Sequence, residues 1–201
     1  MVDTDDVQAL ALSPYSGLGY AAYLPLAAST KQPAMATWLD GLLPAVTCGR
    51  LEKTAKVPRA TNVTFSHAGL RELALDRRAL GGFSAAFRSG MFDESHPQRS
   101  WDLGDVGDSG PEKWRWGSGT KRPLALLMLY ADRQTELGAM VEAARSSAAG
   151  CGLEPVTGAV LEAAWPRRDN VHGFREHFGF VDGISQPRID LGDGSGDAPA
   201  D

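Results

Sequence analysis

The segment Pro123-Leu-Ala-Leu-Leu-Met-Leu-Tyr-Ala131 is a continuous apolar run, which predicts a central strand of a sheet. A helix is expected directly after it, over Asp132–Ala149, with Asp132 as its N-cap. A last strand is expected over Leu153–Leu161. The apolar positions of the helix share one face and are expected to contact the sheet: Leu137, Met140, Val141 and Ala144.

Upstream of this unit, two apolar segments, Val7–Leu12 and Gly19–Leu26, predict strands because a Ser- and Gly-containing turn separates them. The segment Pro33–Val46 has apolar residues at helical spacing and predicts an amphipathic helix. Ser29 and Thr30 are candidate caps for it.

The middle of the chain mixes short elements with a long loop. Asn62–Ser66 alternates like a strand, while His67–Leu75 and Gly82–Met91 have helical spacing. Phe92–Arg122 is rich in Pro, Gly, Asp and Trp and predicts a loop whose tryptophans pack over the core. Because strands and helices do not alternate strictly, the order favours an α+β sheet with helices on one face.

Composition limits the function classes. The 201 residues are 43% hydrophobic and 22% charged, which indicates a globular chain. A net charge of −5 argues against a nucleic-acid partner. The acidic opening Met1–Asp6 and the lack of a long uncharged apolar run argue against export and membrane insertion, so a cytoplasmic location is expected. Cys48 and Cys151 are expected to be small buried side chains in a reducing compartment.

The most distinctive stretch is Arg175-Glu-His-Phe-Gly-Phe-Val-Asp-Gly-Ile-Ser-Gln-Pro187. Gly179 and Gly183 flank Asp182 and allow a tight turn or a close approach to a ligand. The surrounding apolar residues suit a carboxyl group that moves a proton. On these residues alone, an ordinary Asp-Gly turn is an equally good interpretation.

This stretch resembles the GxxDG signature of the dye-decolorizing peroxidases, haem proteins built from two ferredoxin-like domains. The longer match, Glu176 to Pro187, makes the resemblance specific. Three other segments are similar to the same family, so the resemblance covers nearly the whole chain: Asp6–Leu10 as a first strand, Asn62–Leu70, and Leu103–Trp114.

The resemblance implies a ferredoxin-like antiparallel sheet and a peroxidase that uses hydrogen peroxide to oxidise dyes and phenolic compounds. Asp182 would be the distal acid–base, moving a proton between the two peroxide oxygens. The family's cofactor is haem b, and the residues similar to those lining it are Gly183, Ile184, Ser185 and, more weakly, Gln186. The expected partners are hydrogen peroxide and an aromatic reductant, and relatives often self-associate.

The family's proximal histidine lies downstream of the signature, yet residues 183–201 contain no histidine. The chain is therefore interpreted as residues 1–190, an N-terminal ferredoxin-like domain, followed by the acidic Gly/Asp-rich loop 191–201, with the second domain absent. The iron ligand is expected outside this chain, and the isolated chain is expected to bind haem poorly.

The sequence has two other interpretations, a metal site and a second function class. His172 and His177 could suggest a metal site, but their five-residue spacing does not place both rings on one helical face. A structural metal is therefore not expected. The second function class is a non-enzymatic binding or assembly module, a ferredoxin-like sheet that pairs with another domain through an exposed apolar face.

Overall fold

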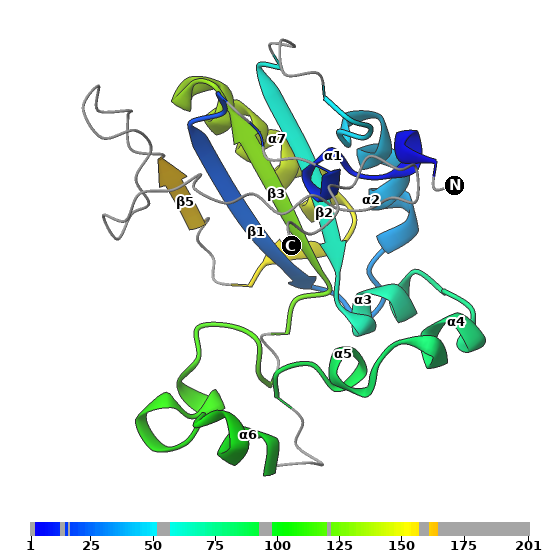
Figure 1. Cartoon of the computed structure of the whole chain (residues 1–201), viewed down its shortest axis with the longest axis vertical. Helices are drawn as coiled ribbons and strands as arrows, with labels where there is room; N and C mark the ends of the chain where they lie inside the picture. The colour runs from blue at the N-terminus through cyan, green and yellow to red at the C-terminus, as the bar shows by residue number, and fades with distance from the viewer. Residues whose placement is uncertain are drawn as a thin grey trace, which may run out of the picture.

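The computed structural model describes residues 3–12, 15, 17–51, 57–92, 98–119, 122–156 and 161–164. Its centre is an antiparallel sheet of strands in the order β2-β3-β1-β4, with β5 also pairing with β1 (Figure 1). The strands are β1 (Tyr20–Ala28), β2 (Arg59–Phe65), β3 (Ala125–Ala131), β4 (Leu153–Pro155) and β5 (Leu161–Ala164).

The chain order is β1, α2, β2, β3, α7, β4, where α2 is Met35–Leu42 and α7 is Gln134–Gly150. Two interleaved β-α-β units with this strand order form the ferredoxin-like fold. The predicted α+β fold is therefore confirmed, with β3 as a central strand and its helix directly after it.

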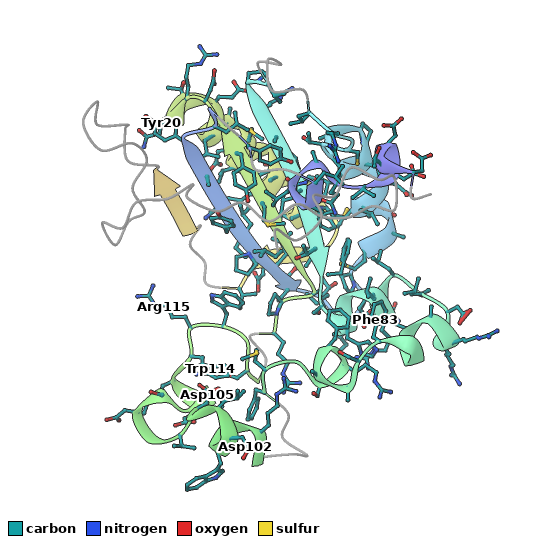
Figure 2. All side chains as sticks on the ribbon, viewed as in Figure 1. Tyr20, Phe83, Asp102, Asp105, Trp114 and Arg115 are labelled. Carbon is teal, nitrogen blue, oxygen red and sulfur yellow. The ribbon has the colours of Figure 1, made fainter. Side chains whose placement is uncertain are left out.

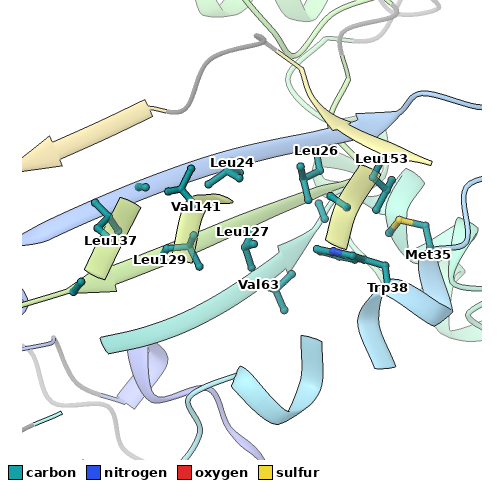
Figure 3. Packing of buried hydrophobic residues seen from close by; sticks show 14 residues of the cluster. Leu24, Leu26, Met35, Trp38, Val63, Leu127, Leu129, Leu137, Val141 and Leu153 are labelled. Carbon is teal, nitrogen blue, oxygen red and sulfur yellow. The ribbon is translucent and has the colours of Figure 1, made fainter. Parts of the chain in front are cut away.

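One face of the sheet is closed by α2 and α7. Burial alternates strictly along β3, because every second side chain points to the helices. Trp38 and Met35 of α2 and Leu137 and Val141 of α7 belong with Leu127 of β3 to one buried core (Figure 3). Most of the fold's stability derives from this apolar layer.

Both helix caps differ from the sequence prediction. The N-cap of α2 is Ala34 rather than Ser29 or Thr30, and that of α7 is Arg133 rather than Asp132; neither makes a side-chain capping bond. Packing against the sheet fixes where these helices begin, and it overrides the local preference.

The prediction of a strand over Val7–Leu12 is wrong, and so is the family-based strand at Asp6–Leu10. The segment forms a 3-10 helix, η1 (Thr4–Asp6), an isolated bridge between Gln8 and Cys48, and a short helix, α1 (Ala9–Leu12). The side chain of Gln8, rather than a run of backbone, makes the contacts with the sheet edge. It accepts a hydrogen bond from the Val63 amide and donates one to the Val63 carbonyl, both at 2.8 Å.

Between β2 and β3, where the simplest version of this fold has a short hairpin loop, lies a lobe of short helices, residues 67–119, which we call the helical lobe. It lies beyond one end of the strands (Figure 1). Its described elements are α3 (His67–Glu72), α4 (Arg77–Gly82), α5 (Ala85–Ser89), α6 (Gln98–Leu103) and two 3-10 helices, η3 (Gly107–Ser109) and η4 (Pro111–Lys113). A further 3-10 turn, η2 (Leu43–Ala45), extends α2.

The helical lobe partly matches its prediction. Helices α3 and α5 were expected, each begins at a serine cap, and α4 was not expected. The cysteines are free, but Cys48 is exposed and Cys151 is half-buried, so the prediction of buried thiols is wrong for Cys48. Within the described ranges, no helix is long and apolar enough to cross a membrane.

Candidate functional site

The signature residues lie outside the described part of the chain. These are the predicted acid–base Asp182 and the predicted cofactor-binding residues Gly183, Ile184, Ser185 and Gln186. Strand β5 is the last described segment before them, and Ala164 pairs with Tyr20 at the first residue of β1. The last described residue, Ala164, thus lies beside the first residue of β1 and precedes Asp182 by 18 residues in the sequence.

The sheet face opposite α2 and α7 has three tyrosines near that same end. Tyr130 of β3 pairs with Ala21, one residue from Tyr20. Its ring lies 5.2 Å from that of Tyr15 and 6.1 Å from that of Tyr23, measured between centroids. Tilted and edge-on contacts at these distances are favourable for aromatic rings. We call Tyr15, Tyr23 and Tyr130 the tyrosine cluster.

Two hydroxyl groups of the tyrosine cluster, those of Tyr15 and Tyr130, have raised pKa values and remain protonated at neutral pH. Burial raises the pKa of Tyr130 far above its ordinary value, and the hydrogen bond with Tyr23 raises it further. Burial also raises the pKa of Tyr15, although the hydrogen bond to Asn62 opposes this shift. Tyr15 and Tyr130 therefore present neutral phenols rather than bases.

A buried amide network joins the tyrosine cluster to the sheet edge. The Tyr15 hydroxyl donates to Oδ1 of Asn62 at 2.6 Å, and Asn62, 1% exposed, donates through Nδ2 to Oε1 of Gln8 at 3.2 Å. Gln8 in turn pairs with the backbone of Val63. Because each buried amide group finds a partner, the network holds the N-terminal segment against β2.

We expect Tyr15→Phe to lower the free energy of unfolding by about 1 kcal/mol, because Oδ1 of buried Asn62 loses its donor while the ring contact with Tyr130 remains. Urea denaturation followed by circular dichroism measures this change. Tyr20→Phe is the matched control, since the Tyr20 hydroxyl has no hydrogen-bond partner in the described structure. Equal losses in the two variants would contradict the role of the Asn62 bond.

The described residues contain no cluster of three His, Cys, Asp or Glu side chains that could hold a metal. Their single histidine, His67, begins α3, and its ring meets Phe83 and Phe87 edge-on. Its Nε2 atom is buried and has no hydrogen-bond partner. This imidazole therefore packs with two phenylalanine rings of the helical lobe.

The tryptophans of the helical lobe were expected to cover the core, and this is wrong for two of them. Trp114 packs edge-on against Phe92 and donates from Nε1 to the Ser109 carbonyl at 2.9 Å. Trp101 is 70% exposed and Trp116 is 36% exposed. The short helices around them have almost no buried interior to receive such large rings.

Sequence analysis missed the tyrosine cluster and the Gln8 network. Tyr15 and Tyr130 are far apart in the chain, and only the pairing of β1 with β3 brings their neighbourhood together. Strand β1 has two tyrosines, Tyr20 and Tyr23, but no local pattern in the sequence indicates which rings they contact.

Comparison with known proteins connects this fold to peroxidases. Peroxidase 2 of Mycetinis scorodonius is 29% identical over 153 residues, which span 75% of this chain and 27% of that protein. No family model matches the chain. The chain thus spans about a quarter of the curated relative, and what that protein does as a whole need not belong to this segment.

Two solved structures share the fold over almost the whole chain. A dye-decolorizing peroxidase with an engineered haem pocket superposes with a TM-score of 0.69 at 20% identity, covering 98% of this chain and 40% of that one. A dye-decolorizing peroxidase in complex with 2,6-dimethoxyphenol gives a TM-score of 0.63 at 19% identity, covering 94% and 40%. The predicted resemblance to this family is confirmed.

Proposed function

We propose that this chain is the GxxDG-bearing part of a haem peroxidase of the dye-decolorizing type. The observation that carries the proposal is the shared fold over nearly the entire chain, combined with a peroxidase as curated relative. The extended signature around Asp182 supplies the residues that this fold alone would not reveal.

The proposed enzyme contains more polypeptide than these 201 residues. Its neighbours of known structure are about two and a half times as long, since the chain covers 40% of them. Residues 1–190 are proposed as one ferredoxin-like domain and residues 191–201 as an acidic loop leading out of it. The iron ligand is then supplied from outside this chain, because in the family that it resembles the proximal histidine follows the signature, and residues 183–201 contain no histidine.

Asp182 is proposed as the acid–base group. When bound, haem supplies the redox-active iron at which peroxide is reduced. The Asp182 carboxylate accepts the proton from one oxygen of hydrogen peroxide and returns it to the other, so that the O–O bond breaks with release of water. Gly183, Ile184, Ser185 and Gln186 are proposed to line the cofactor beside this carboxylate.

The proposed substrates are hydrogen peroxide and an aromatic reductant, a dye or a phenol. A solved neighbour holds 2,6-dimethoxyphenol, which supports the phenolic class. The enzyme is proposed to act in the cytoplasm, without nucleic acid or membrane, and as a homo-oligomer. The competing function, a non-enzymatic assembly module, would require the longer protein to lack peroxide-dependent oxidation altogether.

Haem titration separates these possibilities. We expect the 201-residue chain to bind haem weakly, with no histidine-ligated absorption spectrum, because residues 183–201, which follow the signature, contain no histidine. The longer gene product should bind haem stoichiometrically and oxidise 2,6-dimethoxyphenol only when peroxide is added. His67→Ala, made in both forms, should leave the spectra unchanged. Tight histidine-ligated binding of haem by the 201-residue chain would overturn the proposal that the iron ligand lies outside this chain.

A further inference from the structure

The helical lobe has almost no interior of its own. Among its described residues only Gly69, Ser100, Gly110 and Pro111 are buried, and none belongs to the buried hydrophobic core. From residue 71 to residue 91 nearly every side chain is exposed. Ordering a segment removes conformational entropy, and burial of apolar surface normally offsets that loss. This lobe lacks such burial within the described structure.

The same lobe holds nearly all the exposed large apolar side chains. Nine such residues are found in the described chain, and eight of them lie in the helical lobe: Leu75, Phe83, Phe87, Met91, Trp101, Leu103, Val106 and Trp116. The ninth, Leu43, belongs to η2. Single exposed apolar residues are ordinary, but this concentration in one lobe marks an interaction surface.

An aromatic group lies at the centre of the α3–α5 half. The Phe83 and Phe87 rings lie 4.8 Å apart, both contact His67, and each remains 37% exposed. Figure 2 shows Phe83 among the side chains of this lobe, beyond the strands. Aromatic anchors that are partly buried and partly open are typical of the centre of an interface.

The charge around this aromatic group is basic. Four exposed arginines lie on or beside α3–α5: Arg71, Arg77, Arg78 and Arg88. The same stretch has two acids, Glu72 and Asp76, and Asp76 is engaged as the N-cap of α4, accepting bonds from the amides of Arg78 and Ala79. A matching surface therefore presents apolar side chains surrounded by carboxylates.

We propose that the helical lobe docks the polypeptide that follows residue 201 in the longer protein, through Phe83, Phe87 and Met91. This inference rests on the proposed function. Elsewhere α2 and α7 cover one sheet face and Gln8 pairs with the β2 edge, whereas Phe83, Phe87 and Met91 stay exposed. About 60% of each neighbour's chain lies outside the part that this chain matches, and in the longer protein such polypeptide has to pack against one of the surfaces of this domain.

Hydrogen exchange measured by mass spectrometry tests the docking without haem. In the apo form of the longer protein, peptides from 67–92 should exchange at least about tenfold more slowly than in the 201-residue chain. Peptides from β3, which lies inside the sheet in both proteins, should exchange alike and thereby report that the fold is intact. This readout does not involve activity, so a longer protein without peroxidase activity but with a protected lobe refutes only the proposed function.

Substitutions test whether Phe83 and Phe87 form the proposed docking surface. Phe83→Asp combined with Phe87→Asp should remove the protection in the longer protein, because two carboxylates replace the aromatic anchors. Leu43→Asp, which changes an exposed apolar residue outside the lobe, should retain it. The proposal is wrong if the lobe exchanges equally fast in both proteins, or if protection appears in the 201-residue chain and grows with concentration, which would identify a second copy as the occupant.

Discussion

Replacing Asp182 by Ala in the longer, haem-loaded protein should lower kcat/KM for hydrogen peroxide by about 10²–10⁴-fold, the range expected when a positioned acid–base group is removed. The proposed route for moving the proton between the peroxide oxygens is lost with this carboxylate. The leaving oxygen must then depart as hydroxide, which is a poorer leaving group than water.

Stopped-flow absorbance at several peroxide concentrations measures this loss, and the haem spectrum of the same sample reports whether cofactor uptake is intact. Asp193→Ala is the matched control, since it removes the same charge eleven residues later in the acidic loop. Asp182→Glu should recover part of the rate, because it restores a carboxylate at a shifted position. A wild-type rate in Asp182→Ala would show that another group moves the proton.

The second large effect concerns stability. Gly69→Ala should lower the free energy of unfolding by about 3 kcal/mol, because an added Cβ would lie 2.0 Å from the carbonyl oxygen of Leu124 and 2.8 Å from its carbonyl carbon. Both neighbours are backbone atoms, and the Leu124 oxygen accepts a 3.0 Å hydrogen bond from the Ser66 amide. The clash is relieved only if α3 moves away from the strand.

Urea unfolding of the 201-residue chain measures this effect. Gly81→Ala in α4 is the control, because nothing lies within 4 Å of the added Cβ and alanine is a better helix former. It should be neutral or slightly stabilising. If Gly69→Ala matches it, the close approach of α3 to Leu124 does not restrict this position.

The parts of the fold that the sequence predicts are those with long, regular patterns. The apolar run of β3 and the seventeen-residue helix α7 each bury one continuous face, so periodicity alone identifies them. The strand prediction for Val7–Leu12 was wrong because the segment is only six residues long, and the tertiary bonds of Gln8 to β2 decide its conformation. The prediction that Trp101 and Trp116 cover the core was wrong because the burial of a side chain depends on neighbours that are distant in the chain.

The candidate site divides in the same way. Its signature is local, since Gly179, Asp182 and Gly183 lie within five consecutive residues. It can therefore be recognised without any structure. The tyrosine cluster depends on the pairing of β1 with β3, as between Tyr23 and Met128, and the amide network depends on contacts of Gln8 and Tyr15 with β2. Only the folded chain reveals that these residues share one polar, aromatic surface of the sheet.

The insertion of the helical lobe between β2 and β3 also affects how the chain folds. Phe65 and Ala125 are register partners separated by 59 residues, where a hairpin would have two to five. Closing that longer loop costs roughly 2 kcal/mol more in chain entropy before any bond between these strands forms. The β2–β3 pair is therefore expected to form late and slowly, and until then the apolar β3 segment remains open to association with other chains.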